Sequence, residues 1–347
     1  MKASPTTDLP TRTPAWSGRL PLLLAALVLI ALFCAQRCTG RGEEDLRRSR
    51  IIMGTVVEIT VLGKTAQEAS AAIDEAFAEM ARIEALMTPH DPASDVARLS
   101  GAVSALEVSA ETAEVVALGE KVAAASDGAF DMALGRLKEL WGVEGEAPRV
   151  PTSAAIAAAL EGTGVGDLIL KGKTIAKGSP DLAVDLGGIA KGYAVDRAAA
   201  VLRGAGVERA AINAGGDIRL LGDRKGRPWR IGIQHPREID KLLATLSLGP
   251  SAVVTSGDYE RYFEVGGVRY HHLFDPATGY PSRRCQSVTV VADSAALADA
   301  LATAAFVLGP EGGLRLLEKF PGAEMLLVAA DGSRHLSPGL QGAVTWP

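Results

Sequence analysis

The stretch Asp185-Leu-Gly-Gly-Ile-Ala-Lys-Gly-Tyr-Ala-Val-Asp196 predicts the end of a strand, a glycine turn and the start of a helix. The strand is expected at residues 182–186, and the helix after Gly187-Gly188 as far as about Arg203. The N-terminus of a helix attracts anions, because its first N–H groups are free and its dipole is positive there. Lys191 adds a positive charge in this first turn, where a cation is unfavourable for the helix. The pattern indicates a phosphate or diphosphate site, although an ordinary strand, turn and helix with a solvated lysine would look the same.

Composition narrows the class of protein. The chain has 347 residues, 48% of them hydrophobic and 22% charged, which is enough for one large domain or two lobes. Its net charge is −5, and no basic run occurs in the body of the chain, which argues against nucleic acid as the main partner.

The N-terminal part of the sequence differs from the rest. Residues 20–35 are almost wholly apolar and lie between arginines at Arg19 and Arg37. Such a run makes about 24 Å of helix, which is short for a hydrocarbon core of about 30 Å. We therefore expect residues 1–50 to be a signal or membrane-anchor segment with a linker, and the domain of residues 51–347 to lie outside the cytoplasm, on the periplasmic side of the inner membrane. The sequence leaves open whether this segment is cleaved.

The pattern of elements predicts an α+β fold with a mixed or antiparallel sheet and packed helices. A strand is expected at residues 51–62, and a capping box at Thr65 and Glu68 starts a helix that reaches Met87. Further helices are expected at 109–125 and 294–308, with short strands between 210 and 292. Of three cysteines only Cys285 lies in the body of the chain, so we expect a buried, inert thiol there.

Asp299 and Thr303 are four residues apart in the last helix and therefore share one face. A carboxylate with a hydroxyl suits Mg²⁺, which takes oxygen ligands and keeps water or phosphate oxygens. In the alternative, Thr303 bonds to the carbonyl of residue 299 and the aspartate reaches solvent.

Two adjacent histidines end a strand at His271-His272. Neighbouring residues of a strand point to opposite faces, so the pair cannot easily share a metal. One of them could be a general base, because histidine titrates near neutrality. The alternative is one buried and one surface histidine. Neither a Walker loop nor zinc-ligand spacing is visible in the sequence.

Taken together, these segments resemble the ApbE family of FAD:protein FMN transferases over residues 50–340. Seven motifs in the family's order carry the resemblance: Met53-Gly-Thr55, Gly128-Ala-Phe-Asp131, Asp185-Leu-Gly-Gly-Ile-Ala-Lys-Gly-Tyr193, Asn213-Ala-Gly-Gly-Asp217, Ser256-Gly-Asp-Tyr-Glu-Arg261, His272-Leu-Phe-Asp-Pro-Ala-Thr-Gly279 and Asp299-Ala-Leu-Ala-Thr303. The resemblance implies a T-fold-like catalytic domain. It also implies Mg²⁺-dependent transfer of FMN from FAD to a Thr or Ser hydroxyl of a target flavoprotein, with release of AMP.

The resemblance also implies roles for single residues. The metal would be bound by the Gly188 carbonyl, Asp299 and Thr303, and His272 would take the proton of the acceptor hydroxyl. The FAD site would be lined by Met53, His90, Ala129, Phe130, Asp131, Asp185, Lys191 and Leu273. His90 stands where the family often has a tyrosine, Met132 replaces a usual proline, and Ala277 replaces a usual basic residue.

Three functions other than FMN transfer are also considered. Water could replace the acceptor, which would make the protein an FAD pyrophosphatase that yields FMN and AMP. An exported protein could bind or deliver FAD without turnover, and loss of the Asp299/Thr303 pair would have favoured that function. A purely structural periplasmic domain leaves the seven motifs unexplained.

Overall fold

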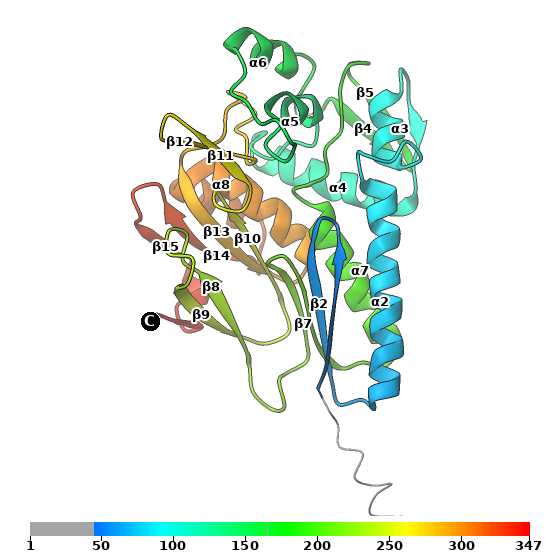
Figure 1. Cartoon of the computed structure of the whole chain (residues 1–347), viewed down its shortest axis with the longest axis vertical. Helices are drawn as coiled ribbons and strands as arrows, with labels where there is room; N and C mark the ends of the chain where they lie inside the picture. Colours follow the sequence, from blue (N-terminus) through cyan, green and yellow to red (C-terminus); the bar gives the residue numbers. More distant parts are fainter. Residues whose placement is uncertain (1–44, 165) are drawn as a thin grey trace, which may run out of the picture. The chain divides into compact units, whose positions relative to one another are not determined.

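The computed structural model describes residues 45–164 and 166–347 (Figure 1). The expected anchor at residues 20–35 lies outside these residues. The domain is built on an antiparallel eight-stranded sheet, in agreement with the predicted α+β class. Its strands are, in spatial order, β1 (Leu46–Ile52), β2 (Thr55–Leu62), β6 (Arg209–Ala214), β7 (Asp217–Leu221), β10 (Ala252–Gly257), β13 (Cys285–Ala292), β14 (Glu324–Ala329) and β15 (Arg334–Leu336).

The first hairpin corrects the sequence prediction, which had one strand at residues 51–62. β1 and β2 are antiparallel and turn at Met53-Gly54, where φ is +54° and +66°. Two positive φ values suit the tight turn of a hairpin. The sheet therefore begins at Leu46, inside the expected linker. The polar residues of β1 are tolerated there because β1 is an edge strand.

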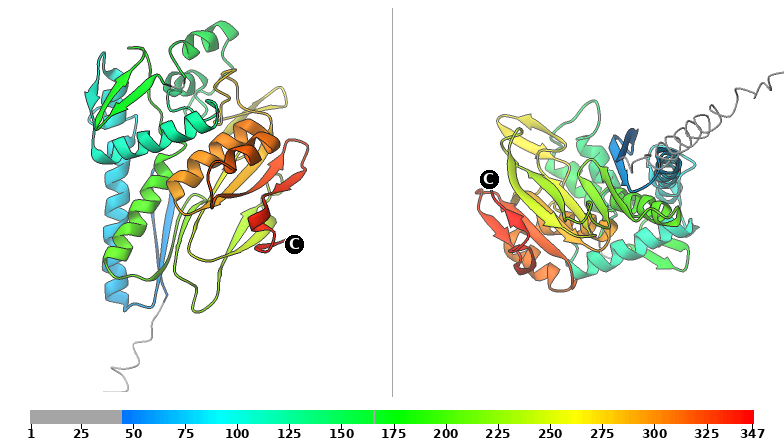
Figure 2. Two further views of the ribbon diagram at one scale, coloured as in Figure 1. Left: turned by 180° about the vertical axis from the view of Figure 1, so that it is seen from behind. Right: turned by 90° about the horizontal axis from the view of Figure 1, so that it is seen from below.

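Three long helices cover one face of this sheet: α2 (Ala66–Met87), α7 (Ala190–Gly204) and α8 (Ala295–Leu317) (Figure 1, Figure 2). The predicted capping box starts α2, and the helix expected at 109–125 is α4 (Ala110–Ala125). α8 does not end at Leu308 as predicted. It bends at Gly309, where φ is +77°, and continues after Pro310. α8 is long and apolar enough to cross a membrane, but its residues are mostly buried in the protein core.

The other face of the sheet packs on a three-stranded sheet of β8 (Trp229–Gln234), β9 (Leu242–Leu248) and β16 (Val344–Thr345). Successive side chains of β14 point alternately to the two faces of the sheet. Met325 and Leu327 belong to the core under the helices, whereas Leu326 and Val328 pack with β8 and β9.

The remaining elements surround one end of the helices (Figure 1). They are α3 (Asp95–Gly101), α5 (Gly135–Trp141), α6 (Ser153–Leu160), the sheet of β3 (Leu106–Glu107), β5 (Thr174–Lys177) and β4 (Leu168–Lys171), and the hairpin of β11 (Tyr262–Val265) and β12 (Val268–His271). The short helix η1 (Pro338–Leu340) lies next to β14 instead.

The segment at residues 182–186 is extended but is not a strand, contrary to the prediction. Its backbone partners lie in a loop instead of a sheet. Asp185 N–H donates to the Met132 carbonyl (2.8 Å), and the Ala183 carbonyl accepts from Gly135 N–H (3.0 Å). These bonds hold residues 129–135 beside the glycine turn that starts α7.

Candidate active site

The N-terminal end of α7 lies directly against α8. Gly192 N–H donates to Asp299 Oδ2 at 3.1 Å. A Cβ atom added at Gly192 would lie 2.3 Å from the Ala295 carbonyl oxygen, so only glycine allows the helices to approach this closely. At the turn itself, a Cβ atom added at Gly188 would lie 3.2 Å from Thr303 Oγ1. The three groups predicted to bind a metal therefore come from distant segments to one place.

Thr303 does not adopt the alternative arrangement, in which its hydroxyl bonds to the carbonyl of residue 299. Its hydroxyl lies 3.5 Å from the Ser256 hydroxyl of β10, and no hydrogen bond to the carbonyl of residue 299 is found in the part of the chain that the structure describes. Asp299 is only 5% exposed, so it does not reach solvent at a rim. Both groups face the interior between α8, α7 and β10.

A second carboxylate adjoins this place. Asp217, at the start of β7, is 1% exposed, and no aligned hydrogen bond reaches either of its oxygens within residues 45–347. Lys191 Nζ lies 3.1 Å from Asp217 Oδ1. The lysine in the first turn of α7 is therefore paired inside the protein, which the sequence did not predict.

The electrostatics of this cluster favour a cation. Burial and the neighbouring Asp217 hold the pKa of Asp299 well above its ordinary value, and burial raises the pKa of Asp217 as well. Two buried carboxylates share one ammonium group, so the ionised cluster carries excess negative charge. Across the described residues, no three His, Cys, Asp or Glu side chains gather as a metal site. Two carboxylates, a hydroxyl and a backbone carbonyl nevertheless fit Mg²⁺, which is bound by few protein oxygens and completed by water and phosphates.

A chain of charged groups continues from the glycine turn. Asp185 Oδ2 lies 2.8 Å from Lys138 Nζ in α5, and Asp185 Oδ1 accepts from Gly187 N–H at 3.0 Å. Arg261 Nη1 lies 2.8 Å from Glu144 Oε1, and Glu144 is 4.0 Å from Lys138. Asp185 thus lies just before the glycine turn, and its charge is already paired with a lysine of the protein.

His272 lies beside these charges. Burial and the charge of Lys138 lower the pKa of His272 to about 3, so its ring is neutral at pH 7. Its Nδ1 lies 3.3 Å from the Arg261 carbonyl oxygen. His271 points elsewhere: its Nε2 is 2.7 Å from the Ser282 carbonyl and its Nδ1 accepts from Leu273 N–H. The two histidines therefore differ: His271 is buried in the core, whereas His272 is partly exposed and lies beside the charged groups.

The other predicted FAD residues fall into two groups. Phe130 has a ring atom 3.2 Å from a Cβ position at Gly188, and the turn at Met53 is next to Arg261, whose Nη2 is 3.9 Å from a Cβ position at Gly54. Ala129 and Asp131 flank Phe130 in the chain, and Leu273 follows His272. Burial raises the pKa of Asp131, whose Oδ1 accepts from Ala133 N–H.

His90 forms the second group. It is exposed, and its N–H donates to Thr88 Oγ1 within its own loop. Among residues 45–347 no hydrogen bond or ring contact joins it to the cluster around Gly188, so its predicted place beside the flavin stays a prediction.

Sequence reasoning missed Lys138, Glu144, Ser256 and the role of Asp217. Asp217 stood in a motif that was noticed, Asn213-Ala-Gly-Gly-Asp217, so a signal existed for it. For Lys138 and Glu144 the sequence carries no signal, because their partners are far along the chain. Cys285 is buried as predicted, and burial raises the pKa of its thiol to about 12.

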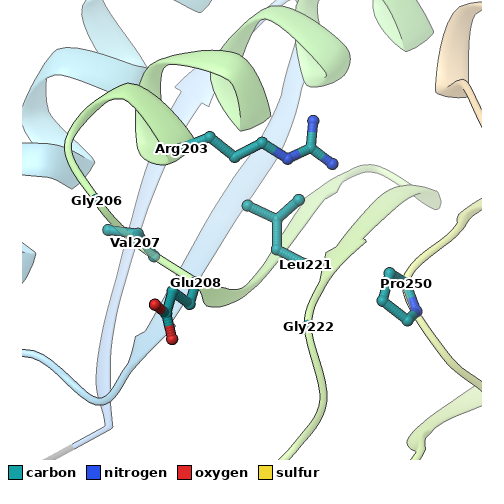
Figure 3. A pocket seen from close by; sticks show the side chains of 7 residues that line it. All are labelled: Arg203, Gly206, Val207, Glu208, Leu221, Gly222 and Pro250. Carbon is teal, nitrogen blue, oxygen red and sulfur yellow. The ribbon is translucent and has the colours of Figure 1, made fainter.

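A surface hollow of ≈ 550 Å³ lies at the opposite end of α7, about 20 Å of helix away from Gly188 (Figure 3). Figure 3 shows Arg203, Glu208 and Leu221 around it. Its lining carries none of the predicted site residues. The charged cluster at the start of α7 is therefore the better candidate for chemistry.

The chain is similar to known proteins over most of its length. The model of the ApbE family matches residues 53–327. The FAD:protein FMN transferase of Rhodobacter capsulatus is 36% identical over 93% of this chain, which spans 62% of that protein's length. The FAD:protein FMN transferase of Treponema pallidum is 33% identical, with 90% of this chain and 93% of that protein covered.

Solved structures show the same fold. The ApbE protein of Thermotoga maritima superimposes with a TM-score of 0.80 at 36% identity, with 86% of this chain and 99% of that chain covered. The flavin transferase ApbE of Vibrio cholerae gives 0.76 at 32% identity, with 87% and 99% covered. The match of the family model over most of the domain, together with these relatives, shows that the chain belongs to the ApbE family.

Proposed function

We propose that the protein transfers FMN from FAD to a Thr or Ser hydroxyl of a target flavoprotein, forming a phosphoester and releasing AMP. The observation that carries this proposal is the meeting of Gly188, Asp299 and Thr303 beside Lys191 at the start of α7. The relatives named FAD:protein FMN transferase support the same reaction.

The diphosphate of FAD would bind at the glycine turn. The positive end of the α7 dipole and the ammonium group of Lys191 would attract its oxygens. Asp299, Thr303 and the Gly188 carbonyl would hold Mg²⁺, with Asp217 next to them. When bound, Mg²⁺ would act as a Lewis acid that neutralises charge on the phosphoryl oxygens. Most of the rate enhancement would come from positioning and charge neutralisation.

His272 would accept the proton of the acceptor hydroxyl. A carbonyl oxygen can only accept a hydrogen bond, so the contact with the Arg261 carbonyl requires the proton on Nδ1. Nε2 then carries the free electron pair. Because its pKa is lowered to about 3, His272 is neutral at pH 7, and this electron pair is free to accept a hydrogen bond from the acceptor hydroxyl. The alkoxide would attack the phosphorus of the FMN half, and AMP would leave with the electrons of the broken P–O bond.

The flavin end of FAD would lie against apolar and glycine-rich segments. Three contacts support this position. Phe130 lies against the glycine turn at Gly188, and the Met53-Gly54 turn lies near Arg261. Leu273 follows His272 directly in the chain. His90, Ala129 and Asp131 are assigned to the same site by resemblance.

Incubation of the protein with FAD, Mg²⁺ and an acceptor flavoprotein tests the proposal. Covalent flavin fluorescence on the acceptor, in equal amount to released AMP, is the expected result. Free FMN and AMP without labelled acceptor would indicate an FAD pyrophosphatase, and bound FAD without AMP would indicate a binding protein.

We also propose that the segment before β1 anchors the protein in the inner membrane with the domain on the periplasmic side. The apolar run at residues 20–35 with its flanking arginines supports this location. Protection of the domain from added protease in intact spheroplasts would contradict it.

A further inference from the structure

Asp217 is unusual among the buried carboxylates of residues 45–347. Asp95 accepts from Ser109 N–H and Thr112 Oγ1, both at 2.8 Å. Asp258 accepts two hydrogen bonds from Arg237 at 2.7 Å. Asp217 is 1% exposed and has no aligned hydrogen bond at either oxygen. A buried carboxylate without donors is unfavourable unless a positive charge compensates for it.

The compensation inside the protein is incomplete. Lys191 Nζ is 3.1 Å from Asp217 Oδ1, but the same ammonium group also faces Asp299. Glu260 is a third carboxylate near Lys191, after Asp217 and Asp299. One lysine therefore stands against three carboxylates, in a place with little water to screen them. A cation bound there would offset the excess negative charge.

The position of Asp217 is fixed by the backbone. It follows a turn at Gly215-Gly216, where φ is +58° and +101°, and the Asn213 side chain accepts from Gly216 N–H at 2.9 Å. A Cβ atom added at Gly215 would lie 2.3 Å from Thr55 Oγ1, so the turn depends on glycine. The chain thus holds a buried carboxylate next to the Asp299 carboxylate and the Lys191 ammonium group.

We infer that Asp217 is a further residue of the proposed Mg²⁺ site, where its carboxylate and that of Asp299 together bind the divalent cation. The inference rests on the proposed function for the identity of the cation. The predicted groups are Gly188, Asp299 and Thr303, and Asp217 adds a second negative charge to them. Lys191, paired with Asp217, is then held where it can reach a phosphate oxygen.

Binding of Mg²⁺ to the FAD-free protein tests this inference without any turnover. The full chain, the Asp217→Asn variant and the Asp95→Asn variant are titrated with MgCl₂ by calorimetry, and their melting temperatures are measured with and without the ion. Asp95→Asn is the matched control, because it neutralises a buried aspartate whose hydrogen bonds are complete.

The expected result has two parts. Asp217→Asn weakens Mg²⁺ binding by about tenfold or more, as for the loss of one carboxylate ligand. In the absence of Mg²⁺ the same variant melts no lower than the natural protein, because it removes one of three negative charges that face a single lysine. Asp95→Asn lowers the melting temperature but keeps the natural affinity for Mg²⁺. Equal Mg²⁺ affinity of Asp217→Asn and the natural protein would overturn the inference.

A second measurement does not depend on the folding of any variant. Crystals of the natural protein soaked in MnCl₂ give anomalous scattering from the ion. The inference expects the peak within about 5 Å of the Asp217 carboxylate, the reach of a contact through one water. A peak beyond that distance would also overturn it. If the ion binds there but no flavin reaches an acceptor, the transferase proposal fails and the role of Asp217 stands.

Discussion

The backbone N–H of Gly192 in α7 donates to the carboxylate of Asp299 in α8 at 3.1 Å. This bond joins the glycine turn to the helix that carries Thr303. It exists because Gly192 has no side chain and lets α7 approach the Ala295 carbonyl. The site therefore depends on the packing of two helices as much as on its polar groups.

Gly192→Ala should disturb fold and site together. The added methyl group would lie 2.3 Å from the Ala295 oxygen, so the helices must separate. We expect a loss of about 1–3 kcal/mol in the free energy of unfolding, as for other overpacked cores. Urea denaturation measures it. Gly204→Ala is the control, because nothing lies within 4 Å of its Cβ position, and it should be neutral or slightly stabilising. Equal effects of the two substitutions would contradict the packing argument.

Asp299→Asn should abolish FMN transfer with little change in stability. The amide oxygen still accepts from Gly192 N–H, whereas the charge for Mg²⁺ is lost. We expect a fall of about 10²–10³ in kcat, as for the loss of one group that stabilises transition-state charge. The assay is covalent flavin on the acceptor, with circular dichroism as the check on folding. Asp293→Asn, at an exposed position of the preceding turn, serves as the control. Normal flavinylation by Asp299→Asn would remove the metal assignment.

The two adjacent histidines offer a matched pair. His272→Gln should lower kcat for transfer by about 10²–10⁴, the usual contribution of a general base, and leave the melting temperature unchanged. His271→Gln should do the opposite. Its ring bonds the Ser282 carbonyl in the core, so its loss should cost about 1–3 kcal/mol of stability. The prediction fails if His271→Gln is the variant with the larger loss of kcat at unchanged stability.

The pH dependence of transfer should report on Lys138. Burial and this lysine lower the pKa of His272 to about 3, and the neutral, base form exists above that pKa. In the natural protein, protonation of His272 therefore costs activity only at strongly acidic pH. In Lys138→Gln the pKa should rise by about one unit or more, because a nearby like charge is gone. The acid limb of the activity profile then moves to higher pH.

NMR titration of the His272 ring measures the same shift directly. Lys173→Gln is the control, since Lys173 forms an exposed ion pair with Glu107. An unchanged pKa of His272 in Lys138→Gln would contradict the proposed electrostatic coupling.

Local patterns in the sequence were enough for the long elements. The capping box of α2, the serine at the start of α4 and the alternation in the later strands all have short-range causes. The prediction was wrong at residues 182–186, where apolar residues bond to a loop, and at β1, whose polar residues carry no strand signal.

The candidate site could be predicted only in part. Asp299 and Thr303 share a helix face, which spacing alone reveals. The cluster of Lys138, Glu144 and Arg261 joins three segments that no periodicity relates. The pairing of Lys191 with Asp217 likewise depends on how β7 lies against α7, which only the assembled fold determines.

The most direct test is to locate the metal in crystals soaked with FAD and Mn²⁺, using anomalous scattering from the ion. The account predicts one peak in contact with the Asp299 carboxylate, the Thr303 hydroxyl and the Gly188 carbonyl, with diphosphate oxygens of FAD beside it. A peak elsewhere, or FAD bound with its diphosphate away from the start of α7, would contradict it.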